Sequence, residues 1–193
     1  ARLAYMPQRE AVDWSFPVTV YDVVLMGRQA QIGWLRHASQ GDREAVHAAL
    51  QAVGMWEQRT RPIARLSGGQ QQRVFLARTL AQEGDCLLLD EPLTGVDATT
   101  EETILAVLRT LHRQGRTLLL STHDLSMAST LCSKLLFLNR RVVAYGPVAE
   151  TLTPETLRQT YGGHVVVGEP DAPLRLWADD AHHSHEITGP RRR

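Results

Sequence analysis

The chain has 193 residues, which is long enough for one domain that buries a sizeable core. Its 21 lysines and arginines balance 21 aspartates and glutamates, so the net charge does not demand nucleic acid or an anionic membrane surface as a partner. The 2 cysteines are too few for a disulfide framework and favour a reducing compartment, and no apolar run approaches the roughly 20 residues that cross a bilayer.

The first part of the chain is predicted to contain one short strand and then a block of helices. The strand covers residues 2–6, and Pro7 interrupts it. Apolar residues at helical spacing predict three helices, at residues 19–28, 42–55 and 67 to about 81. Asp42 is the expected N-cap of the second helix.

The following part alternates between apolar strands and helices. Strands are predicted at residues 86–91 and 116–122, and helices at 98–114 and 124–132. Unbroken apolar strands separated by helices indicate an α/β fold with a parallel sheet covered on both faces. A hairpin turning at Asn139 and Arg140 follows, and then a helix with Thr153 as its cap and Pro154 at its first position.

The first motif with chemical potential is the strand CLLLDE, which ends on Asp90 and Glu91. In open α/β sheets, ligands bind at the carboxyl ends of the strands. Successive strand residues point to opposite sides, so one carboxylate could hold Mg²⁺ through water while the other polarises an attacking water. Taken alone, this motif would more often be an ordinary acidic pair at a strand end.

The second motif is LSGGQ, which opens the helix at residue 67. Two glycines allow the backbone to approach a ligand closely, and a helix N-terminus offers free N–H groups and a partial positive charge. Ser67 could cap this helix and also donate to a phosphate oxygen. A glycine-rich turn before a helix would be the alternative reading of this motif by itself.

The order of the motifs is more specific than any one of them. LSGGQ, a helix, an apolar strand ending in DEP, TGVD and a second apolar strand ending in STHD follow one another. This series resembles the ATP-binding cassette (ABC) ATPases from residue 2 to about residue 161. The resemblance implies a partial P-loop NTPase-type domain over residues 1–163, with a mainly parallel sheet flanked by helices and a helical subdomain at about 18–81. Residues 164–193 are expected to form a poorly ordered tail.

The resemblance assigns four residues to the nucleotide site of this chain itself. Gln8, after the YMPQ strand, would be the Q-loop glutamine that reaches toward Mg²⁺ and the attacking water. Asp90 would bind Mg²⁺ through water, and Glu91 would be the catalytic carboxylate that positions the attacking water. His123 would be the switch histidine that contacts the γ-phosphate, although a histidine after a buried strand is often only structural.

The resemblance assigns a second group of residues to a site shared with another protomer. Ser67, Gly68, Gly69 and Gln70 would form the signature motif, which faces ATP held by the partner. Asp97 would belong to the D-loop, which communicates across the dimer. These roles imply ATP and Mg²⁺ as cofactors and a second ATPase subunit, identical or different, as a partner.

The stretch YMPQREAVDWSFPVTVYDVVLMGR is similar to the ATPase subunits of bacterial importers for manganese, zinc or chelated iron. This implies ATP hydrolysis coupled to transport, integral-membrane permease partners, an indirect link to a solute-binding protein, and a peripheral position on the cytoplasmic face of the bacterial inner membrane. Residues 8–34 would border the groove that receives a permease helix. Trp14, Phe16 and Pro17 are candidate contacts, and packing within the helical subdomain is an equal alternative.

The phosphate-binding motif G-x-x-x-x-G-K-[ST] does not occur in the 193 residues. Without that loop no backbone cradle holds the β-phosphate, so we expect an N-terminal truncation and a chain that is inactive by itself. The alternative is a non-catalytic regulatory or interaction protein that lends its signature motif to a partner. An ABC ATPase of DNA repair or chromosome structure is disfavoured, because one compact helical block separates Gln8 from the signature and no basic patch supports a DNA footprint.

The C-terminal tail carries His182, His183 and His185 close to acidic residues at 179, 180 and 186. Imidazole and carboxylate groups could bind a divalent transition metal. A solvated terminus is the favoured reading of this segment.

Overall fold

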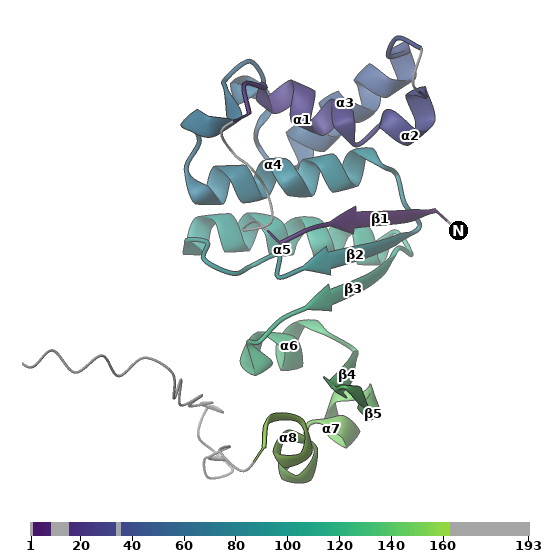
Figure 1. Cartoon of the computed structure of the whole chain (residues 1–193), viewed down its shortest axis with the longest axis vertical. Coiled ribbons are helices and arrows are strands. Elements are labelled where there is room, and N and C mark those ends of the chain that lie inside the picture. Colours follow the sequence, from purple (N-terminus) through teal and green to yellow (C-terminus); the bar gives the residue numbers. More distant parts are fainter. Residues whose placement is uncertain (1, 9–15, 34–35, 163–193) are drawn as a thin grey trace, which may run out of the picture. The chain divides into compact units, whose positions relative to one another are not determined.

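The computed structural model describes residues 2–8, 16–33 and 36–162 (Figure 1). Contacts between Cα atoms divide the chain into two units, residues 1–123 and 124–193, which we describe separately. Trp14 and the histidine-bearing tail lie outside the described residues. The domain boundaries expected from the sequence, at residues 163 and 164, therefore remain a prediction.

The first unit contains a three-stranded parallel sheet in the order β1-β2-β3, whose arrows point the same way in Figure 1. The strands are β1 (Leu3–Met6), β2 (Cys86–Asp90) and β3 (Thr117–Ser121). Tyr5 lies opposite Leu88, and Leu88 lies opposite Leu119. Parallel neighbours need long crossovers, and helices provide them here. The α/β class predicted from the sequence is confirmed.

One face of this sheet is buried and the other is open in the described part of the chain. Ala4, Met6, Leu87 and Leu89 are at most 2% exposed and share a core with the two helices α4 (Gly68–Ala81) and α5 (Ala98–Arg113). On the opposite face Leu3, Tyr5 and Leu119 are each more than half exposed. The expectation of a sheet covered on both faces is therefore wrong for these residues, because α4 and α5 contribute to one common core.

The helical block packs against α4. It consists of α1 (Val20–Met26), α2 (Gln29–Ile32), α3 (Gln40–Ala52) and the 3₁₀ turns η2 (Trp56–Gln58) and η3 (Ile63–Arg65). Gly27 allows the end of α1 to approach α4 closely, since an added Cβ would lie 2.3 Å from the carbonyl oxygen of Arg78. Only glycine fits this contact.

The start of α3 differs from the sequence prediction. Ser39, not Asp42, is the N-cap, and its hydroxyl accepts a hydrogen bond from the Asp42 N–H. The Asp42 carboxylate accepts from the Ser39 N–H in return, so the two residues form a capping box. Both residue types favour helix starts, and only the reciprocal bonding distinguishes cap from third position.

A buried ion pair joins the helical block to the end of α4. Arg28 is 8% exposed, and its Nε donates to the Asp42 carboxylate of α3 at 3.0 Å. Its Nη1 donates to the Ala81 carbonyl at 2.8 Å and to Glu83 Oε2 at 2.6 Å. One guanidinium thus connects three elements, which matches the capacity of arginine to donate in several directions.

The second unit has a small core of its own. It contains α6 (Leu125–Leu131), the antiparallel pair β4 (Lys134–Asn139) and β5 (Arg141–Pro147), α7 (Val148–Thr151) and α8 (Pro154–Tyr161). The predicted hairpin turn is confirmed, and Arg140 has a φ of 59° there. Thr153 caps α8 and Pro154 is its first residue, as predicted. None of the helices in the described ranges is both long and apolar enough to span a membrane.

Candidate functional site

Three of the predicted site residues meet at the carboxyl ends of the parallel strands. Gln8 follows β1, Glu91 follows β2 and His123 follows β3. The Gln8 amide donates from Nε2 to Glu91 Oε2 at 3.3 Å, and His123 Nδ1 lies 3.6 Å from Glu91 Oε1. Glu91 is therefore flanked by an amide on one oxygen and an imidazole on the other, as expected at this edge of an α/β sheet.

Glu91 has a left-handed backbone, with a φ of 45°. This conformation costs an L-residue roughly 1–2 kcal/mol, so neighbouring groups must hold it in place. The Glu91 N–H donates to Ser121 Oγ at 3.0 Å. On the other side Gln72 Nε2 donates to the carbonyls of Pro92 at 2.9 Å and Glu91 at 3.4 Å.

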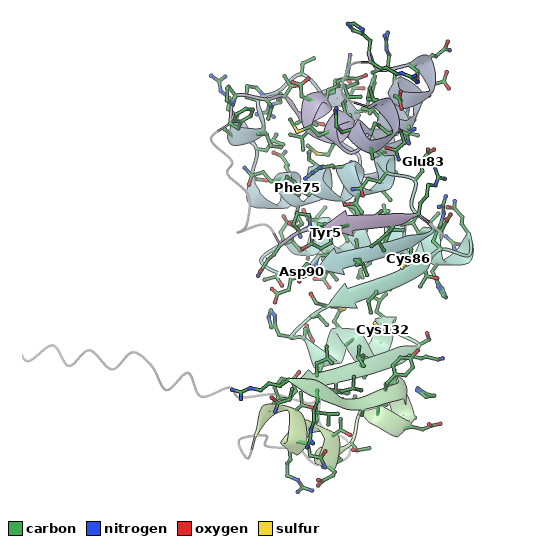
Figure 2. The ribbon with its side chains drawn as sticks, turned by 45° about the vertical axis from the view of Figure 1, so that its right-hand side comes forward. Tyr5, Phe75, Glu83, Cys86, Asp90 and Cys132 are labelled. Carbon is green, nitrogen blue, oxygen red and sulfur yellow. The ribbon has the colours of Figure 1, made fainter. Side chains whose placement is uncertain are left out.

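Asp90 is fixed by the same hydroxyl. Ser121 Oγ donates to Asp90 Oδ1 at 2.6 Å, and Figure 2 shows Asp90 at the arrowhead end of β2. Sequence reasoning missed Ser121 and Gln72. Two signals could have identified them: a hydroxyl residue at the end of an apolar strand, and a glutamine within the apolar face of a helix.

The side chains at the carboxyl ends of the parallel strands include oxygen ligands of the kind that Mg²⁺ prefers. Mg²⁺ prefers oxygen ligands and keeps several waters, so one or two carboxylates are sufficient in a nucleotide site. Asp90 and Glu91 supply two carboxylates, and Gln8 adds an amide. Among the described residues no group of three or more His, Cys, Asp or Glu side chains could hold a metal by itself. This donor set suits a hydrated cation shared with phosphate, not a transition-metal cage.

The signature residues form the start of α4. Ser67 is the N-cap, and its Oγ accepts from the Gln70 N–H while Gln70 Oε1 accepts from the Ser67 N–H. Gly68 and Gly69 lie in the first turn, where helix N–H groups lack partners within the helix. No hydrogen bond or ion pair within the described ranges joins these four residues to Gln8, Asp90, Glu91 or His123.

Asp97 caps α5. Its Oδ1 accepts from the Thr100 N–H at 2.9 Å, and the Thr100 hydroxyl lies 3.0 Å from Oδ2. These bonds, the backbone bond first, lower the pKa of the Asp97 carboxyl. The contact of Asp97 with another protomer remains a prediction. Phe16 and Pro17 are both exposed, with Phe16 at 60%.

Comparison with known proteins identifies the family. The family model described as ABC transporter matches residues 1–94. The manganese transport system ATP-binding protein MntB of Halalkalibacterium halodurans is 49% identical over 164 residues, which cover 85% of this chain and 66% of that protein. A Cyanophora paradoxa protein named "Probable ABC transporter ATP-binding protein in ycf23-apcF intergenic region" is 43% identical over 165 residues, which cover 86% of this chain and 68% of that protein.

The fold agrees with these sequence matches. A solved structure described as "An inward-facing conformation of a putative metal-chelate type ABC transporter" aligns with a TM-score of 0.75 and 28% identity, covering 83% of this chain and 63% of that one. The chain thus spans less than two thirds of the MntB relative and of this solved protein. The motifs, the converging strand ends and the sequence matches agree, and the chain belongs to the ABC transporter family.

Proposed function

We propose that this chain is the ATP-binding and ATP-hydrolysing part of a bacterial importer for metal ions, namely manganese, zinc or iron, in which hydrolysis powers transport through a membrane permease. One observation carries the proposal. Gln8 and His123 both lie against the Glu91 carboxylate, in a chain that is 49% identical to a manganese transport ATP-binding protein.

The roles of the residues follow from their positions. Asp90 would hold Mg²⁺ through water, and the bound cation would neutralise charge on the phosphates. Glu91 would accept a hydrogen bond from the attacking water, while the Gln8 amide directs one of its oxygens. His123, with a side chain that is 71% exposed, would reach a γ-phosphate as a hydrogen-bond donor.

The signature motif would act on a nucleotide held by another subunit. The 14-residue helix α4 presents the free N–H groups of its first turn and a partial positive charge at Ser67. A second ATPase subunit, identical or different, is therefore the proposed partner, and Asp97 would contact it. The exposed Phe16 and Pro17 would face the permease. The chain would then lie at the cytoplasmic face of the membrane, and a solute-binding protein would be linked to it indirectly.

A chimera tests this function. The 164 matching residues of this chain replace those of the Halalkalibacterium MntB protein, in cells that contain its permease and lack the native ATPase subunit. We expect restored uptake of manganese, and loss of uptake in the Glu91→Gln chimera, which keeps the shape of the side chain and removes its negative charge. Zinc and iron uptake measured in parallel would rank the metals.

A folded chimera that binds the permease but supports no metal uptake would contradict the proposal. Equal uptake by the chimera and by its Glu91→Gln variant would exclude Glu91 from catalysis. A chimera that binds the permease and blocks uptake by the native subunit would favour a regulatory role.

A further inference from the structure

The hydroxyl of Ser121 links both carboxylate residues of the site. It lies 3.0 Å from the backbone nitrogen of Glu91 and 2.6 Å from Asp90 Oδ1. The Glu91 N–H can only donate, so the hydroxyl oxygen must accept there. The one hydroxyl proton is then left for Asp90, and the direction of both bonds is determined.

We propose that Ser121 is a positioning residue for the divalent-cation site, because one hydroxyl orients the Asp90 carboxylate and holds the left-handed turn at Glu91. The inference rests on the proposed function, in which Asp90 holds Mg²⁺. Its bond to Oδ1 uses one of the roughly four acceptor sites of the Asp90 carboxylate and leaves Oδ2 available to a cation or to its water. A carboxylate held in one orientation loses less freedom when it binds a metal, which is the general effect of outer-sphere partners.

Gln72 supports the same turn from the other side. It is 2% exposed, and its amide donates to the carbonyls of Glu91 and Pro92. Ser121 thus binds the N–H of the turn and Gln72 binds its carbonyls. Gln72 belongs to α4, whereas Ser121 ends β3, so two separate elements keep Glu91 in its left-handed conformation.

The test uses the full 193-residue chain and Mn²⁺ alone as the probe, with binding followed by the loss of the free Mn²⁺ signal in electron paramagnetic resonance. The difference between the wild-type chain and Asp90→Asn isolates the site from any other Mn²⁺ binding. We expect Ser121→Ala to weaken the Asp90-dependent affinity about 10-fold or more, the usual effect of removing an outer-sphere partner. Ser121→Thr, which keeps the hydroxyl and suits a strand, should retain the wild-type affinity.

A matched control is Ser129→Ala, which removes an exposed hydroxyl of α6 that donates to the Ser126 carbonyl. It should leave Mn²⁺ affinity unchanged, and thermal unfolding of each variant shows that it is folded. Equal Asp90-dependent affinity in wild type and Ser121→Ala would overturn the inference about Ser121 and would leave the proposed cation site standing. An equal loss in Ser121→Thr would overturn it too, since the hydroxyl would then not matter. If Asp90→Asn changes no Mn²⁺ binding at all, the proposed cation site fails and the inference fails with it.

Discussion

Gly69 and Asp97 lie against each other at the starts of two helices. A Cβ added to Gly69 in α4 would be 2.9 Å from Oδ2 of Asp97, the N-cap of α5, and 2.6 Å from the Thr100 hydroxyl. The packing of α4 on α5 therefore favours glycine at position 69, because a larger residue would meet these two side chains.

Gly69→Ala should destabilise the chain, because the added methyl group displaces the Thr100 hydroxyl and the Asp97 carboxylate that caps α5. Overpacking of this kind costs about 1–3 kcal/mol, measurable as a lower free energy of unfolding in urea. Gly41→Ala in α3 is the control, since the nearest atom outside its own helix backbone is 3.8 Å away. It should be neutral or stabilise by up to about 1 kcal/mol. Equal effects of the two changes would contradict this packing requirement.

Arg28→Met should cost about 3–5 kcal/mol, because it leaves the buried carboxylate of Asp42 without its cation. Arg158→Met removes an arginine from a pair with Glu155 in which both side chains are about 60% exposed. That change should cost less than about 1 kcal/mol. Urea unfolding of both variants measures the two losses, and a similar loss in both would show that the buried Arg28 pair contributes no more stability than an exposed pair.

Lowering the pH should reduce the free energy of unfolding, partly because the Asp97 carboxylate becomes protonated. Bonds from Thr100 lower the pKa of this carboxyl below its ordinary value, so its contribution to stability is present above a pH of about 4 and is lost as the pH falls through the folded pKa. Asp97→Asn still caps α5 but cannot titrate. The free energy of unfolding between about pH 5 and pH 2 should therefore fall less steeply in this variant. If the free energy of unfolding falls with pH as steeply in Asp97→Asn as in the wild type, protonation of Asp97 does not contribute to the loss of stability.

The two faces of β3 should respond differently to the same substitution. Leu119 is 53% exposed, whereas its neighbour Leu118 packs against the main core. Leu119→Thr should leave the free energy of unfolding within about 0.5 kcal/mol and reduce self-association in light scattering, because it removes apolar surface. Leu118→Thr should cost about 1–3 kcal/mol. A larger loss of stability in Leu119→Thr than in Leu118→Thr would contradict the assignment of the exposed and buried faces of β3.

The purified 193-residue chain should not hydrolyse ATP by itself. Its sequence contains no G-x-x-x-x-G-K-[ST] loop, so it has no such cradle for the β-phosphate. Phosphate release with and without Mg²⁺ measures this, and Glu91→Gln serves as the background. Magnesium-dependent turnover above that background would refute the prediction.

Residue order alone was sufficient to predict the α/β class and most elements. The apolar runs before Asp90 and Ser121 are strands, and Ser67 and Thr153 cap helices, as predicted. These features depend on the chemistry of side chains that are close in sequence, so a short segment is sufficient to predict them. The candidate residues of the site came from the order of the motifs and from the resemblance to the ABC ATPases.

Tertiary structure decided what those residues touch. Gln8 and Glu91 are 83 positions apart, and their contact exists because β1 and β2 are parallel neighbours in one register. The Ser121 hydroxyl between Asp90 and Glu91 depends in the same way on the register of β2 and β3. The sequence by itself determined which side chains are available for the chemistry. Long-range strand pairing decided which of them share hydrogen bonds, because pairing register is a property of two distant segments together.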